Sequence, residues 1–238
     1  MKIFKVILVL SILLSGEVLL PAQSADKIIS TYIKAIGGKK ISKITSLYTE
    51  SSADIMGNEA AMKTTVLNGK GYKMEMEIMG AVVATCITDQ GGWTINPMTG
   101  GSSAEDMPEE TYKDSKSQIY IGGPFTIYKE QGYTAELLGK EKVSGKEASK
   151  VQLTAPWGKT SVFYFDEATG YLVKSAEETE AQGQVMETVI IYSDYKEVGG
   201  MLIPHTLDLD VGGMFQMTSK VTKAEVNQPV DPAVFAKP

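Results

Sequence analysis

The strongest constraint on this chain is a strict two-residue alternation of apolar and polar side chains near its C-terminal end. From residue 203 to 211 the odd positions carry Ile, His, Leu, Leu and Val, and the even positions carry Pro, Thr, Asp and Asp. Successive side chains of a β-strand point to opposite faces of the sheet, so this strand has one apolar face and one solvated face. With Gly199-Gly200 before it, the stretch from Tyr192 to Val211 predicts a hairpin. Helices, a second sheet or a ligand must cover the apolar face of such a sheet.

The same alternation recurs along most of the chain. In the first half it is cleanest at 72–78, where Tyr, Met, Met and Ile alternate with Lys, Glu and Glu. Residues 81–88 are apolar at both parities, so we expect a central strand covered on both sides. Glycine-containing turns separate the remaining predicted strands, which lie at 47–55, 60–66, 93–95, 135–143, 148–154, 160–166, 171–179, 184–196, 201–211 and 214–225. This spacing predicts a mainly β fold built as one antiparallel meander.

Helical patterns are few. Apolar residues from Ile28 to Ile36 follow helical spacing, and Gly37-Gly38 ends that helix. A second helix start is marked by Asp106, Pro108, Glu109 and Glu110, and the segment from there to about Tyr120 interrupts the strand series. This segment is either a lid or crossover on the sheet or a plain surface excursion. Near the C-terminus, Asp231-Pro232 predicts a last short turn that docks Phe235.

The first 24 residues have the pattern of a secretory signal peptide. Lys2 and Lys5 precede a short apolar run at 6–14, and small residues at 22–24 provide a cleavage site. The run is too short and interrupted for a membrane span, and a retained anchor is the alternative reading. We therefore expect a mature domain at 25–238 that lies in the periplasm. Its single cysteine, Cys86, can form no intrachain disulfide and is expected to be a buried, inert thiol.

Charge composition excludes several kinds of partner. The net charge is −6, and all basic residues are lysines, since the chain contains no arginine. An acidic balance disfavours nucleic acid and simple electrostatic adhesion to anionic membranes. Without arginine the chain also lacks the usual bidentate grip on phosphate or carboxylate groups.

Residues for catalysis or metal binding are sparse. One histidine, His205, excludes a two-histidine zinc site, and its place inside a strand gives no support for a catalytic triad. It is either a hydrogen-bonded residue on the covered face or a ligand contact. Asp208 and Asp210 share a strand face but need more converging oxygen ligands to bind calcium. The glycine pairs lack the phosphate-loop pattern. We therefore expect a protein that is not an enzyme and uses no cofactor and no metal.

Methionines are the remaining unusual feature. Met56, Met62, Met74, Met76, Met79, Met186, Met214 and Met217 fall in or beside predicted strands. Methionine is flexible and polarizable, so it serves either as core filler or as the lining of an apolar binding site. An acyl chain in such a site gains about 0.8 kcal/mol per buried CH₂, or on the order of 10 kcal/mol for ~14–16 carbons before ordering costs.

Five stretches also carry a family likeness: YIKAIGGKKISKITSL, GGWTINPMTG, VFYFDEATGYLVKSAEETE, YSDYKEVGGMLIPHTLDL and the closing DPAVFAKP. In this order they resemble the periplasmic outer-membrane lipoprotein-sorting proteins, and more closely their LolA-like relatives. The resemblance implies an α+β fold in which a curved antiparallel sheet forms an incomplete β-barrel with helices covering its concave face. It also implies a hydrophobic cavity that receives acyl chains of a lipid or lipoprotein and exchanges them with membrane partners as a helical lid opens and closes.

One departure concerns the lid, which the sorting carriers are expected to hold closed with an arginine on the sheet. This chain has none, so either a lysine or His205 replaces it or the regulated handover is missing. We expect a monomeric carrier whose partners are acyl chains and envelope membrane proteins. The alternative is an interaction or sensor module whose cavity is filled by its own side chains. Strand parity assigns the cavity to Tyr72, Met74, Met76, Ile78, Trp93, Ile95, Ile190, Ile203, His205, Leu207, Leu209, Phe215 and Met217.

Overall fold

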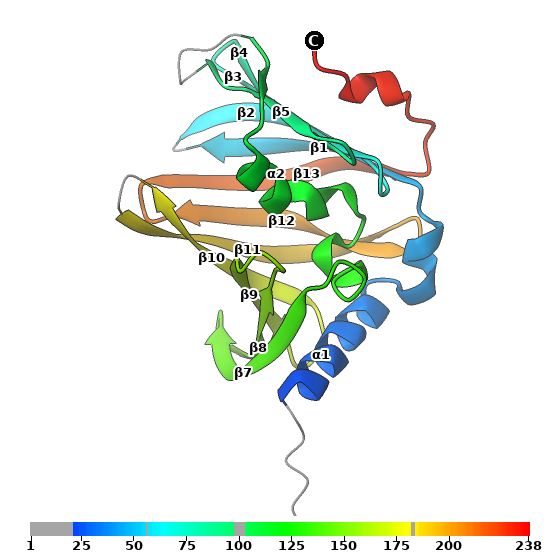
Figure 1. Ribbon diagram of the computed structural model, residues 1–238, viewed down its shortest axis with the longest axis vertical. Helices are drawn as coiled ribbons and strands as arrows, with labels where there is room; N and C mark the ends of the chain where they lie inside the picture. The colour runs from blue at the N-terminus through cyan, green and yellow to red at the C-terminus, as the bar shows by residue number, and fades with distance from the viewer. Residues whose placement is uncertain (1–20, 56, 98–102, 182–183) are drawn as a thin grey trace, which may run out of the picture.

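A computed structural model describes residues 21–55, 57–97, 103–181 and 184–238. Its strands form one antiparallel sheet that curves without closing (Figure 1). The strands are β1 (Ser46–Ile55), β2 (Asn58–Leu67), β3 (Gly71–Ile78), β4 (Ala81–Thr88), β5 (Gly92–Ile95), β6 (Glu105–Asp106), β7 (Thr134–Val143), β8 (Lys146–Thr154), β9 (Thr160–Asp166), β10 (Leu172–Ala181), β11 (Gln184–Val198), β12 (Met201–Val211) and β13 (Phe215–Val226). The helices are α1 (Pro21–Ala35), α2 (Glu109–Ser115) and the 3-10 helices η1 (Gly38–Lys43), η3 (Lys116–Ile119), η4 (Gly123–Thr126) and η5 (Pro232–Phe235).

The strand order explains where the helices lie. It runs β6-β5-β4-β3-β2-β1-β13-β12-β11-β10-β9-β8-β7, so the chain starts in the middle of the sheet and builds outward to the β6 edge. It then resumes at the opposite edge with β7 and returns strand by strand until β13 pairs with β1. The connection from β6 to β7 must therefore cross the sheet, and it carries α2, η3 and η4. Of the two readings of this segment, the crossover is confirmed.

The main core forms where α1 and the crossover pack on the sheet. Ile29 and Tyr32 of α1 lie in one buried cluster with Phe125 of η4 and Phe163 and Phe165 of β9. The Tyr32 and Phe125 rings meet edge to face at 5.1 Å between centroids, and Phe125 meets Phe163 at 4.8 Å. Edge-to-face pairs of this kind add stability beyond the area they bury. This core holds α1 against the sheet.

Gly37 ends α1 where the helix meets the β11–β12 turn. Its φ of 143° lies in the region that favours glycine, and a Cβ there would stand 2.9 Å from the Gly200 carbonyl oxygen. Only glycine allows so close an approach without strain. Leu202 N–H then donates to the Ile36 carbonyl oxygen at 2.8 Å, which ties the helix end to β12.

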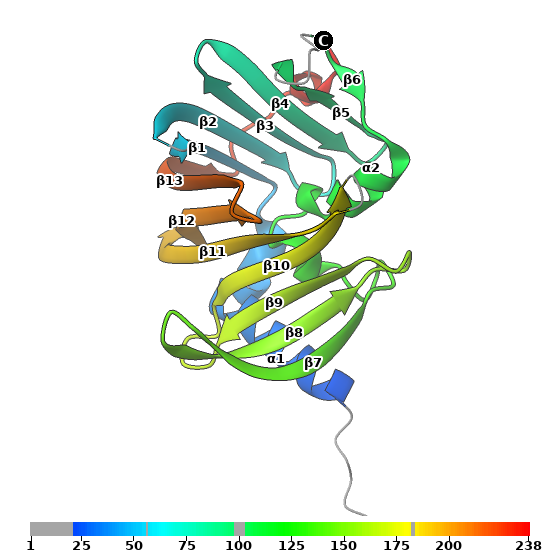
Figure 2. The same ribbon diagram turned by 90° about the vertical axis from the view of Figure 1, so that its left-hand side faces the viewer.

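Cross-strand register assigns each side chain to one of the two faces, because directly paired residues point the same way. Val66 of the main core pairs with Leu47 and with Tyr72, so the odd positions of β1 and the even positions of β2 and β3 face α1. We call this side the concave face and its opposite the outer face. Figure 2 shows the molecule turned by 90° from the view of Figure 1, with α1 behind the strands.

The predicted strands agree with the structure, with one correction in placement. β4 is covered on both sides, since Ile87 on the concave face and Cys86 on the outer face are fully buried. It is not central, because it lies near the β6 edge, where the C-terminal segment covers its outer face. The predicted last turn is η5, in which the Asp231 carboxylate accepts from Ala233 N–H at 2.9 Å and Phe235 is buried.

The N-terminal expectations are not tested by this fold. Residues 1–20 lie outside the described residues, and α1 begins at Pro21, before the predicted cleavage site. Signal-peptide cleavage therefore stays a prediction. Within the described part of the chain, no helix is both long and apolar enough to cross a membrane.

Candidate functional site

The concave face gathers almost all of the predicted cavity residues, although they come from five strands. β3, β11, β12 and β13 contribute Tyr72, Met74, Met76, Ile78, Ile190, Ile203, His205, Leu207, Leu209, Phe215 and Met217 to this face. The alternation of faces is unbroken through all of these residues. The register shift between β1 and β13 lies where Glu50 and Ser51 pair with β13, outside this set. The fifth strand, β5, carries the two exceptions.

Along the concave face these residues fall into three zones. Tyr72 and Ile203 belong to the main core beneath α1. At the far end, Met76, Phe215 and Met217 pack against Ile78 and small neighbours on β1 and β2 in a second cluster. Around these cores, and including the three partly buried members of the second cluster, apolar side chains remain only half-buried. We call these half-buried side chains the apolar band, and its members are Met62, Met74, Met76, Ile190, Leu207, Leu209, Phe215 and Met217.

Trp93 and Ile95 are a correction, because they lie on the outer face. Trp93 pairs with Cys86, and both residues pack with Phe235 in a separate cluster. The indole Nε1 of Trp93 donates to the Phe235 carbonyl oxygen at 3.0 Å. The physical reason is the β4–β5 turn, which pairs Ile87 with Gly92 and so puts a glycine, not the tryptophan, on the concave face. In a four-residue strand the apolar side chains alone could not reveal this parity.

Buried polar groups interrupt the apolar surface of the concave face. His205 is buried, and its Nδ1 lies 3.1 Å from the Ile203 carbonyl oxygen, which fits the first of its two expected roles. Burial raises the pKa of Tyr72 to about 12. Ser219 is 1% exposed, and its hydroxyl has no hydrogen-bond partner among the described residues. An unpaired buried hydroxyl costs about 1–3 kcal/mol, so the middle of this face is not optimised as a closed core.

Helix α2 lies in front of β12 and β13 (Figure 1), and two of its side chains attach it to opposite arms of the sheet. On the first arm, the Tyr112 hydroxyl donates to the Thr88 carbonyl oxygen at 3.0 Å. On the second, the Asp114 carboxylate accepts from Trp157 Nε1 at 2.7 Å and from Lys159 Nζ at 3.0 Å. None of the α2 side chains is buried. The helix therefore bridges β4 and the β8–β9 turn without filling a core.

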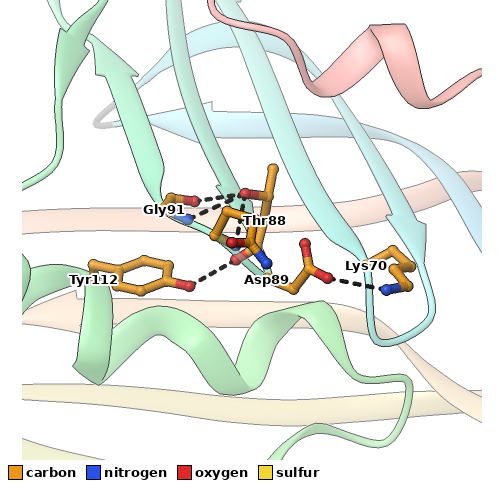
Figure 3. A network of polar contacts seen from close by, with 6 residues as sticks. Lys70, Thr88, Asp89, Gly91 and Tyr112 are labelled. Atoms are coloured by element: carbon orange, nitrogen blue, oxygen red, sulfur yellow. Dashed lines mark hydrogen bonds and ion pairs between the residues drawn. The ribbon is translucent and has the colours of Figure 1, made fainter.

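Figure 3 shows the first attachment and the turn that supports it. The Thr88 hydroxyl donates to the Gly91 carbonyl oxygen at 3.0 Å and accepts from Gly91 N–H at 3.2 Å, which holds the β4–β5 turn. Lys70 Nζ pairs with the Asp89 carboxylate at 3.0 Å, and this hydrogen bond lowers the pKa of Asp89. Tyr112 thus contacts a turn that hydrogen bonds and an ion pair hold in place.

Lys159 is the centre of the second attachment. Its Nζ lies 3.0 Å from Asp114 of α2 and 3.5 Å from Glu177 of β10. Partial burial opposes the charge on this lysine, but hydrogen bonds and attraction from the two carboxylates outweigh it and raise the pKa of Lys159. Lys159 is therefore charged at neutral pH and joins the helix to the sheet.

Several residues of this site were not among the sequence predictions for the cavity. Met62 shares its parity with Val66 and faces the apolar band, so the alternation of β2 already contained that signal. Tyr112 and Asp114 had no comparable signal. Their partners lie 24 and 43 residues away in the sequence, and nothing local marks such pairs.

The described residues contain neither a cluster of metal ligands nor a reactive thiol. They contain no group of three or more His, Cys, Asp or Glu side chains that could hold a metal ion. Asp208 and Asp210 lie on the outer face, where Thr218 and Gln216 donate to them. Cys86 is buried, and burial raises its pKa to about 11, so it stays a thiol at neutral pH.

Comparisons of the whole fold find similar solved structures. A DUF1329 family protein from Desulfovibrio piger superposes with a TM-score of 0.63 at 12% identity, over 91% of this chain and 98% of that one. A putative outer membrane lipoprotein-sorting protein domain from Vibrio parahaemolyticus gives 0.60 at 13% identity, over 91% and 97%. A LolA superfamily protein from Nitrosomonas europaea gives 0.59 at 12% identity, over 92% and 98%. The chain has a LolA-like fold.

This LolA-like likeness is one of structure. No protein-family model matches the sequence, and no curated protein matches it either. At such low identities the likeness establishes the fold, an incomplete barrel with helices, as the sequence resemblance implied. It does not identify a cargo or a partner.

Proposed function

We propose that this protein is a non-enzymatic periplasmic carrier that holds acyl chains of a lipid or lipoprotein against the concave face of its LolA-like sheet. The observation that carries the proposal is the apolar band, whose side chains stay half-buried beneath a helix that buries none of its own. A protein that used this face only as core would cover it, as α1 covers the main core. An uncovered apolar surface inside a curved sheet is the usual form of a hydrophobic binding site.

The chemistry of the band matches a hydrocarbon ligand. Four of its members are methionines or phenylalanine on β3 and β13, whose soft side chains adapt to ligands of variable shape. No lysine or acidic residue belongs to the band, so charged side chains take no part in binding the acyl chain. About 0.8 kcal/mol per buried CH₂ is sufficient for tight binding of an acyl chain.

In this proposal α2 is the lid, and a lysine takes the place of the expected arginine. Release of Asp114 from Lys159 and Trp157 would free α2 from the β8–β9 turn while Tyr112, in the middle of the helix, stays on the β4–β5 turn. The lid would then swing rather than detach. A lysine makes a single-point contact where arginine would make a bidentate one, so we propose a weaker latch.

Localisation and domain limits belong to the same proposal. The basic and apolar pattern of residues 1–24 supports export with cleavage, which leaves a 25–238 carrier domain. We propose that it works as a monomer that exchanges cargo with envelope membrane proteins.

The decisive experiment is to purify the mature protein without detergent, extract it with organic solvent and analyse the extract by mass spectrometry. Uptake of a fluorescent fatty acid is then measured for the wild type and for Met76→Glu and Leu209→Lys. Both substitutions place a charge in the apolar band and should abolish uptake, because burying an unpaired charge is strongly unfavourable.

Matched controls are available on the outer face. Val82→Glu and Val185→Lys introduce the same charges at positions where the side chains are already exposed to solvent. These variants should bind like the wild type. A protein that is empty as purified and takes up no fatty acid would favour the alternative module with a self-filled interior. Folded band variants that still bind would refute the assignment of the site.

A further inference from the structure

A groove lies on the outer face of the sheet. It has a volume of about 660 Å³ and runs over β1, β11, β12 and β13 near the ends of their hairpins. Four carboxylates line it, namely Asp54, Glu187, Asp208 and Asp210, with Val189 and Ile191 between them. Register puts these six residues on the face opposite to α1. The groove also borders Leu209 and Met217, two members of the apolar band that register assigns to the concave face. The groove and the proposed acyl-chain site therefore share strands β12 and β13 but use opposite faces of the sheet.

Three of the four carboxylates accept hydrogen bonds from neutral donors rather than from lysines. Asp208 accepts from the Thr218 hydroxyl at 2.7 Å, and Asp210 accepts from Gly213 N–H at 2.6 Å and from the Gln216 amide at 3.0 Å. Asp54 accepts from Gly57 N–H at 2.8 Å. In the part of the chain that the structure describes, none of the four forms an ion pair, whereas lysines pair with acids at many other surface positions. The groove thus keeps a concentrated, uncompensated negative charge.

Apolar surface adjoins this charge. Val189 and Ile191 are half-buried between the carboxylates. At the hairpin end, Val185 precedes Glu187 on the same face of β11 and is 69% exposed, and Met214 follows Gly213 and is 61% exposed. Two of the most exposed large apolar residues of the described chain therefore lie within two residues of Glu187 and Gly213, which line the groove. Carboxylates alone would indicate only a solvated surface. A groove in which carboxylates surround apolar side chains suits a ligand that is both basic and apolar.

We propose that this outer groove binds a basic amphipathic segment of a partner protein, in which lysine or arginine side chains meet the four carboxylates and apolar side chains cover Val189 and Ile191. Charge complementarity selects this occupant. A second copy of this chain would bring a net charge of −6 to an acidic surface, and an anionic membrane would be repelled in the same way. A bare cation would leave the apolar floor uncovered. The proposal does not depend on acyl-chain binding, which uses the other face of the sheet.

The test uses the full mature protein and two labelled peptides, Lys-Ile-Lys-Val-Lys and Glu-Ile-Glu-Val-Glu, in fluorescence anisotropy titrations. We expect the lysine peptide to bind and the glutamate peptide not to bind. The affinity for the lysine peptide should fall at least about tenfold between roughly 50 and 500 mM NaCl. The double variant Asp208→Asn, Asp210→Asn keeps the oxygen acceptors for Thr218 and Gln216 and should weaken binding about tenfold. Met214→Ser should weaken it by a smaller factor.

Controls separate the groove from net charge and from general stickiness. The double variant Glu105→Gln, Glu130→Gln removes the same charge at exposed positions outside the groove, and Leu138→Ser removes an exposed apolar side chain elsewhere. Both should bind the lysine peptide like the wild type. Equal loss in the two double variants, equal binding of both peptides, or no binding of either peptide would overturn the proposal. Fatty-acid uptake measured on the same Asp208/Asp210 variant should be unchanged, so failure here is distinct from failure of the carrier proposal.

Discussion

Phe235 shows how one residue can hold a distant part of the sheet. Its carbonyl oxygen accepts from Trp93 Nε1 at 3.0 Å and from Cys86 Sγ at 3.3 Å. Its ring lies so close to Gly71 that a Cβ there would stand 2.9 Å away. The C-terminal turn therefore closes the outer face of β3 to β5, and the absence of a side chain at Gly71 makes room for it.

Replacing this side chain should be costly. We expect Phe235→Ala to lower the free energy of unfolding by about 3–5 kcal/mol, because it leaves a cavity over Gly71 and Cys86. Denaturant unfolding measures the loss, and Val234→Ala at the exposed neighbouring position is the control. Cys86 should be unreactive toward a thiol reagent in the wild type and become reactive in the variant. A loss below about 1 kcal/mol would contradict the docking role of Phe235.

At the scale of elements, α1 and α2 are attached to the rest of the molecule in different ways. α1 buries a row of apolar residues, and Asp26 adds polar contacts from the helix to the crossover, with Tyr128 Oη at 2.5 Å and Lys129 Nζ at 2.6 Å. α2 buries none of its residues and depends on Tyr112 and Asp114. One helix covers the main core, and the other contributes no buried side chain to it.

The α2 attachments should therefore control local opening more than global stability. We expect Asp114→Ala to speed amide hydrogen exchange in residues 109–119, while the free energy of unfolding falls by only about 1 kcal/mol. Lys113→Ala is the matched control, since it breaks the Glu109–Lys113 pair within the helix and leaves both attachments in place. Equal exchange in the two variants would contradict the latch.

The α1 contact gives a pH-dependent prediction. Hydrogen bonds from Lys129 and Tyr128 hold the pKa of Asp26 below its ordinary value of 3.8. A depressed carboxyl pKa stabilises the folded state above the ordinary value, and the contribution disappears as pH falls through the folded value. Because Asp26 is 40% exposed, we expect Asp26→Asn to cost only about 0.5–1 kcal/mol near neutrality. The free energies of unfolding of the two proteins should converge as pH falls from 3.8 through the lower pKa that Asp26 has in the folded state.

At the scale of the whole molecule, the buried tyrosines make the stability of the fold depend on pH in alkaline solution. Burial raises the pKa of Tyr72 to about 12 and raises the pKa of Tyr192 and Tyr195 as well. A raised tyrosine pKa means that the unfolded chain loses its proton first, so this stability is complete below about pH 10 and is lost as pH rises.

A spectrophotometric tyrosine titration tests this. We expect exposed tyrosines to ionise near pH 10 in a reversible step and the buried ones to ionise only together with unfolding, which circular dichroism follows in parallel. Ionisation of all tyrosines in one reversible step near pH 10, with the fold intact, would show that the interior is open to water.

Sequence alone determined the strands, their turns and most of the faces, because these follow from a two-residue period that neighbouring residues carry themselves. Met74, Met76, Leu207 and Leu209 were assigned to one face in this way, and the register agrees. The period failed for Trp93, where a short strand after a turn leaves parity undetermined. Tertiary structure alone decided that β6 and β7 lie at opposite edges, that α2 crosses between them, and that Asp114 meets Lys159. Those facts depend on contacts between distant segments, and no local pattern of side chains encodes which distant partner a polar group will meet.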